Sequence, residues 1–173
     1  MLISISARAF PLDFVRLDQD ILSPFAGKKQ LYTYETMDFW EQIKIPRMSL
    51  KCSGLYLSRF RLTFANLLAG GDGTKSALIV GDVYVHPSEK VHLAAKIGPN
   101  VSISANVRIG AGARLINCIV LDDVEVQADG DYNAKLGITI LGEAVIVEDE
   151  VVINSIVLPN KTLNLSVQEE IFL

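Results

Sequence analysis

The stretch VYVHPSEKVHLAAKIGPNVSISANVRIGAGARLINCIVL, residues 83–121, decides how this chain folds. Aliphatic residues recur along it at an unbroken spacing of six, in the series Val85, Val91, Ile97, Ile103, Ile109, Leu115 and Leu121. A second small or aliphatic residue stands two positions before most of them, namely Ala95, Val101, Val107, Ala113 and Ile119. Neither an α-helix nor an ordinary strand has this period. The repeat predicts a parallel β-helix, in which each hexad forms one side of a triangular prism and points its first residue into the interior.

The same period returns nearer the C-terminus. Its positions there are Leu141, Val147 and Ile153, with Val145, Val151 and Val157 as the companion residues. Residues 127–139, QADGDYNAKLGIT, break the pattern and are predicted to form a loop that projects from the prism. We therefore expect a mainly β chain with a β-helix over residues 83–173. The known hexapeptide proteins imply a left-handed prism.

Composition excludes several classes of protein. Half of the 173 residues are hydrophobic, the formal net charge is −4, and no basic stripe suggests a nucleic-acid partner. The cysteines, Cys52 and Cys118, form neither a disulfide framework nor a metal-ligand motif, which favours a reduced, cytoplasmic protein. The N-terminal MLISISARAF lacks the features of a signal peptide, and no apolar run is long enough to cross a membrane.

The region before the repeats has no six-residue period. Within residues 13–60 the local pattern predicts helices over 15–22 and 49–60, a strand over 30–34 and a helical turn over 38–43. Residues 66–82, NLLAGGDGTKSALIVGD, are predicted to be a glycine-rich linker to the first turn of the prism.

The order of these parts resembles a known family. The segment DQDILSPFAGKKQLYTYETMDFWEQIKIPRMSLKCSGLYL, residues 18–57, is similar to the closing stretch of a sugar-nucleotide pyrophosphorylase domain. The repeats at 84–126 and 138–163 resemble the mannose-1-phosphate guanylyltransferase (GDP-mannose pyrophosphorylase) family, and within it the plant alpha-type proteins. The resemblance implies that residues 1–65 are the C-terminal remnant of an α/β nucleotidyltransferase domain. It also implies that the chain is truncated to the family's C-terminal portion.

The resemblance also implies what this chain lacks. Catalytic members carry F-W-x-D-I-G, whose Asp ligates the Mg²⁺ that bridges the phosphates. Here the motif reads FWEQIK, residues 39–44, with Gln42 at the Asp position and Lys44 at the Gly position. A neutral amide is a poor ligand for a hard cation. We therefore expect no catalytic residue, metal or cofactor in this chain, and assign no substrate-binding residue. The alpha-type resemblance implies instead a regulatory or assembly role, as a homo-oligomer or with a catalytic pyrophosphorylase subunit.

Two features leave enzymatic alternatives open. LAGGDGTK, residues 68–75, is close to the family's phosphate-binding signature, but the remainder of that signature does not follow, and a flexible linker is favoured. His86 and His92 each follow an inward aliphatic residue. A hexapeptide acyltransferase that uses one of them as general base is the alternative function. Surface or subunit-contact histidines are the simpler interpretation.

Overall fold

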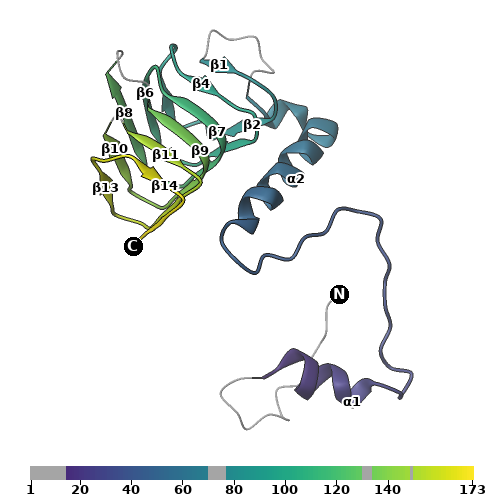
Figure 1. Cartoon of the computed structure of the whole chain (residues 1–173). Helices are drawn as coiled ribbons and strands as arrows, with labels where there is room; N and C mark the ends of the chain where they lie inside the picture. The colour runs from purple at the N-terminus through teal and green to yellow at the C-terminus, as the bar shows by residue number, and fades with distance from the viewer. Residues whose placement is uncertain (1–14, 70–76, 130–133, 149) are drawn as a thin grey trace. The chain divides into compact units, whose positions relative to one another are not determined.

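A computed structural model describes residues 15–69, 77–129, 134–148 and 150–173 (Figure 1). The chain divides into two compact units, Met1–Asp38 and Phe39–Leu173, and each is described by itself. The predicted glycine-rich signature falls largely outside the described residues. No helix in the part of the chain that is described is long and apolar enough to span a membrane.

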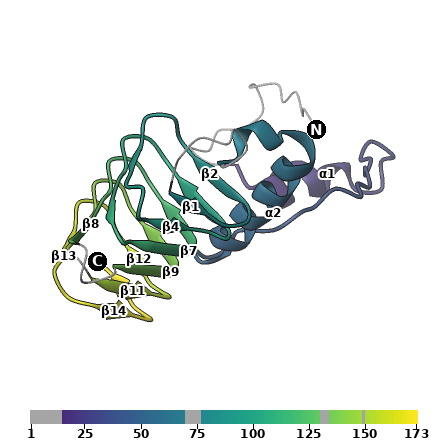
Figure 2. The ribbon, with the colours of Figure 1, turned by 90° about the horizontal axis from the view of Figure 1, so that it is seen from above.

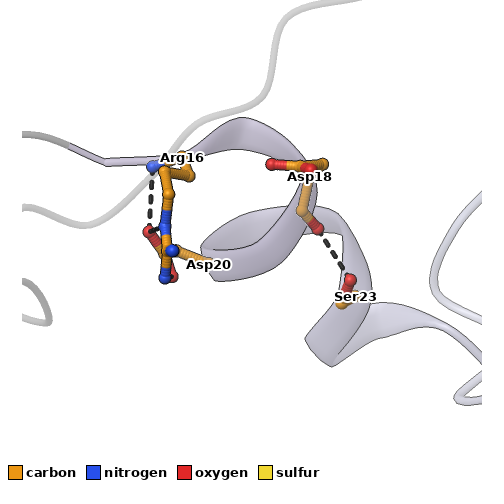
Figure 3. Close-up of polar contacts among 4 residues, drawn as sticks. All are labelled: Arg16, Asp18, Asp20 and Ser23. Carbon is orange, nitrogen blue, oxygen red and sulfur yellow. Dashed lines mark hydrogen bonds and ion pairs between the residues drawn. The ribbon is translucent and has the colours of Figure 1, made fainter.

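In the described part of the first unit, residues 15–38, the regular structure consists of short helical turns. They are the π-helix η1, Leu17–Leu22, and α1, Ser23–Phe25. Arg16 and Asp20 form an ion pair of 3.1 Å, which lowers the pKa of the Asp20 carboxyl, and the Ser23 hydroxyl donates to Asp18 O at 2.8 Å (Figure 3). The predicted helix over 15–22 is thus confirmed. The predicted strand over 30–34 is wrong, because a strand needs a neighbour to pair its backbone groups and none of the described strands pairs there.

The second unit begins with irregular chain and one long helix. Residues 39–44 are irregular, so the helical turn expected over 38–43 is wrong. The helix α2, Met48–Thr63, confirms the helix expected over 49–60, and the short 3₁₀ helix η2, Ala65–Leu67, follows it. Leu68 then forms an antiparallel bridge to Tyr84, and Ala69 N–H donates to Val83 O, so the chain runs directly beside the first turn of the repeats.

The remainder is a parallel β-solenoid of about five turns with three faces (Figure 2). The first face stacks β1 (Leu78–Ile79), β4 (Lys96–Ile97), the starts of β7 (Arg114–Val120) and β9 (Lys135–Leu141), β11 (Val151–Ile153) and β14 (Val167–Gln168). The second face stacks β2 (Val83–Val85), β5 (Val101–Ile103), the ends of β7 and β9, β12 (Ile156–Val157) and β15 (Ile171–Phe172). The third face stacks β3 (Lys90–Val91), β6 (Arg108–Ala111), β8 (Glu125–Asp129), β10 (Ile146–Glu148) and β13 (Thr162–Leu163).

The core follows the six-residue period only part of the way. Ile97, Ile103, Ile109 and Leu115 are buried as predicted, but Leu121 is 40% exposed and its companion Ile119 is half-buried. Cys118 and Val120 occupy the interior instead. The chain turns the corner at Asn117, whose φ is +50°, and this corner, between Leu115 and Cys118, is one residue shorter than the corner between Ile97 and Val101 in the previous turn. A shift of one residue in a strand exchanges its inner and outer side chains.

The same shortening recurs in the last turns. Leu141, Val145, Val147 and Val157 are buried as predicted, whereas Val151 and Ile153 are half-buried and Val152 takes the interior position. The expected loop region 127–139 holds the end of β8 and the start of β9, with residues 130–133 outside the described part. The described core therefore remains continuous across this interruption, since β7 and β9 pair along both of their halves.

Candidate functional site

The FWEQIKIP segment, residues 39–46, leads into α2 and is held against it by two side chains. The ring of Phe39 meets that of Tyr56 edge-on, with centroids 5.1 Å apart. The Glu41 carboxylate forms an ion pair with Lys51 on α2. Trp40, in contrast, is 75% exposed. The segment is thus anchored by its first aromatic residue and by a charge pair, while most of its other side chains face solvent.

These residues do not fit a magnesium site. Gln42 offers only a neutral amide, and the neighbouring carboxylate of Glu41 is already paired with an ammonium group. Lys44 adds a further positive charge two residues on, which opposes the binding of a cation. Among the described residues, no group of three or more His, Cys, Asp or Glu side chains could hold a metal ion.

Both histidines accept a backbone hydrogen bond at the same ring nitrogen. Ser88 N–H donates to His86 Nδ1 at 3.2 Å, and Ala94 N–H donates to His92 Nδ1 at 3.1 Å. In the neutral ring this arrangement places the proton on Nε2, which then acts as a donor and not as a base. The two residues follow β2 and β3, on different faces of the solenoid. This geometry gives the acyltransferase alternative no positioned general base.

The helix α2 docks on the solenoid (Figure 2) through contacts that the sequence does not reveal. Leu57 is only 2% exposed, and it is the only buried side chain of α2. The hydroxyl groups of Ser53 and Ser102 lie 2.8 Å apart, which joins α2 to β5. Arg61 approaches Asp82, just before β2, at 3.6 Å. Leu57, the Ser53–Ser102 contact and the Arg61–Asp82 pair therefore all help to hold α2 on the solenoid.

A groove of about 440 Å³ runs between α2 and the corner that joins the first and second faces. Its lining is Leu50, Lys51, Gly54, Leu55, Ser58, Asn100, Asn117 and Ile138. No carboxylate lines it, and the mixture of amide, hydroxyl and aliphatic groups offers no acid, base or nucleophile pair for catalysis.

An aromatic row follows α2. It consists of Phe39, which precedes the helix, Tyr56 and Phe60 within it, and Phe64 directly after it. Successive rings of Tyr56, Phe60 and Phe64 meet edge-on, at centroid distances of 6.3 and 6.2 Å. Tyr56 and Phe64 are both more than half exposed. Tyr56, Phe60 and Phe64 are spaced by four residues, and residues so spaced lie on one face of a helix. This spacing is the sequence signal from which the row could have been predicted. Exposed aromatic side chains of this kind are typical of protein–protein contacts.

Known proteins similar to this chain point to a single family. Residues 79–132 match the family model described as GMPPB C-terminal domain. A probable mannose-1-phosphate guanyltransferase of Schizosaccharomyces pombe is 33% identical, over 92% of this chain and 47% of that protein. The regulatory subunit alpha-B of mannose-1-phosphate guanylyltransferase from Danio rerio is 35% identical, over 93% and 48%. A probable mannose-1-phosphate guanylyltransferase 3 of Oryza sativa is 30% identical, over 87% and 45%.

The chain spans about half the length of the curated relatives that it matches. The alignments with the yeast and zebrafish proteins extend over 202 and 204 positions, more than the 173 residues of this chain, so both relatives contain residues inside the matched region that this chain lacks. Within these limits the chain is a homologue of the mannose-1-phosphate guanylyltransferases.

Proposed function

We propose that this homologue of the mannose-1-phosphate guanylyltransferases is a non-catalytic subunit that regulates or assembles a GDP-mannose-forming enzyme. The observation that carries the proposal is the FWEQIK segment, where Gln42 replaces the metal-binding Asp that catalytic members have and Glu41 is paired with Lys51. A magnesium-dependent transfer of a nucleotidyl group requires metal ions to neutralise the phosphate charge. This segment supplies no free carboxylate for that purpose.

Two further observations support a regulatory role. Relatives from zebrafish and rat carry the name mannose-1-phosphate guanylyltransferase regulatory subunit alpha. The described residues, in addition, form a stacked solenoid with an exposed aromatic row on α2, and not an enclosed polar cavity. Such a rigid surface is suited to binding another protein, and the partner that we propose is a catalytic guanylyltransferase subunit.

Co-expression with a catalytic mannose-1-phosphate guanylyltransferase tests the proposal. We expect the two chains to co-purify and the purified chain alone to form no GDP-mannose from GTP and mannose 1-phosphate. The Gln42→Asp variant should stay inactive, because one carboxylate on an exposed segment does not rebuild a metal site. GDP-mannose formation by the purified chain, or a failure to co-purify with the catalytic subunit, would refute the assignment.

A further inference from the structure

Three cations stand in register on the outer surface of the first face. Lys96 pairs with Arg114, and Arg114 with Lys135, on consecutive turns. All three side chains are exposed, and none forms an ion pair with a described residue. Neighbouring strands are about 4.8 Å apart, so this cationic row places like charges directly opposite one another. Such pairs destabilise a sheet, which means that the fold by itself gains nothing from the row.

An apolar row lies beside the cationic row on the same face. Val80, Ile116 and Ile153 point outward from alternate turns, and Gly98 and Gly137 occupy the turns between them. Gly98 is required by the backbone, since its φ is +105°. Gly137 is not required, because a Cβ there would meet no atom within 4 Å and its φ is ordinary. The missing side chain keeps the face flat between Ile116 and Ile153 without any benefit to the fold.

Acidic side chains beside apolar ones are found on another surface of the same chain. Asp122, Asp123 and Glu143 are exposed at the corner between the second and third faces, and none of them has an ion pair with a described residue. Leu121 and Leu158 lie directly before this corner, and each is 40% exposed. We refer to these five residues as the acidic edge. The acidic edge combines negative charges with a short apolar row, just as the first face combines positive charges with an apolar row.

We propose that the first face binds the acidic edge of a second copy of this chain. The charge complementarity specifies the partner surface, and the two apolar rows supply the area to be buried. Exposed ion pairs are worth only about 0–1 kcal/mol each, so their main effect is on the register and rate of association. Because the two surfaces differ, the contact is heterologous and generates a closed ring or a filament. The inference rests on the proposed assembly function and names one partner within it.

Sedimentation equilibrium of the purified chain, at low and at high salt, tests this contact. We expect salt-sensitive self-association. Its dissociation constant should rise about tenfold or more in Arg114→Glu and in Glu143→Lys, and a tenfold rise corresponds to a loss of about 1.4 kcal/mol of binding free energy. The double variant Arg114→Glu, Glu143→Lys should recover association, because the two exchanged residues again carry opposite charges. Lys90→Glu is the matched control, since Lys90 is an exposed cation on the third face, and it should leave the constant unchanged.

A variant without a charge change completes the test. Gly137→Phe should fold normally, because the site is open and the backbone unstrained, and should abolish self-association by filling the gap in the first face. A chain that stays monomeric at all concentrations, or an oligomer that none of these variants affects, would overturn the proposal. If Arg114→Glu instead releases only a co-purifying catalytic guanylyltransferase, the second copy is the wrong occupant, while the proposed function survives.

Discussion

Asn100 and Asn117 lie one above the other at the same corner of consecutive turns, and Asn100 Nδ2 donates to Asn117 Oδ1 at 3.0 Å. Both residues adopt a left-handed backbone, with φ of +57° and +50°. Asn tolerates this conformation better than other residues with a side chain. The next two turns place Ile138 and Asn154 at the equivalent corner, each with φ of +54°. A single β-branched residue therefore interrupts a column of asparagines.

Ile138→Asn should stabilise the protein. The left-handed backbone conformation costs an L-residue roughly 1–2 kcal/mol of conformational free energy, and Asn relieves most of that cost. Ile138 is 47% exposed, so little apolar burial is lost. We expect the free energy of unfolding in urea to rise by about 1 kcal/mol. Ile138→Val keeps the β-branch and should give no gain, whereas a loss of stability in Ile138→Asn would contradict the strain argument.

The Cys118 thiol is expected to make stability fall at alkaline pH. Burial raises the pKa of this thiol from 9.0 to about 12. In the unfolded chain the thiol loses its proton near its ordinary pKa, so above pH 9 the unfolded state binds fewer protons than the folded state. Stability should fall by up to about 1.4 kcal/mol per pH unit between these values. Urea unfolding across this range measures the slope.

Cys118→Ser is the control for the pH effect. Thr139 and Ser155 occupy the equivalent inward position in the next two turns, so a hydroxyl is accepted there. The variant should lose the part of the alkaline slope that depends on the thiol. Cys118 should also resist thiol reagents in the folded protein and react after denaturation, and rapid labelling of native Cys118 would show that it is not enclosed.

Thr139→Val should destabilise the solenoid through its interior. The Thr139 hydroxyl is fully buried, and its single proton is shared between the carbonyl oxygens of Gly137 at 2.9 Å and Val152 at 3.1 Å. Valine has nearly the same shape but leaves these carbonyls without the donor, which costs about 1–3 kcal/mol. Thr139→Ser retains the donor and tests the contribution of the methyl group separately. Equal stability of the valine variant and the parent in thermal unfolding would contradict this account.

Leu57→Ala should release α2 from the solenoid. Leu57 is the one buried side chain of the helix, and a Leu→Ala change in such a site typically costs about 2–5 kcal/mol. Limited proteolysis should then cut within α2 while the β-sheet signal in circular dichroism persists. Arg61→Ala is the comparison, because Arg61 is mostly exposed and its pair with Asp82 should contribute less than about 1 kcal/mol.

Much of the solenoid could be predicted because its signal is local and repeated. The series from Ile97 to Leu115 places one aliphatic residue per side, and the buried residues follow it. The predicted phase fails at Asn117, because the corner between Leu115 and Cys118 holds one residue fewer than the equivalent corner between Ile97 and Val101. The number of residues in a corner cannot be read from the six-residue period. The period therefore predicts Leu121 and Ile119 in the core, whereas Val120 and Cys118 lie there.

The sequence by itself determined the repeat, its fold class and the replacement at Gln42, because each depends on residue identity and spacing along one chain. Only the tertiary structure decided which residues from different turns meet. It paired Ser53 with Ser102, aligned Lys96, Arg114 and Lys135, and stacked Asn100 on Asn117. These contacts join residues that are distant in the chain, and their register depends on the length of every intervening side. A single shortened corner changes that register without altering the local pattern on which the prediction relies.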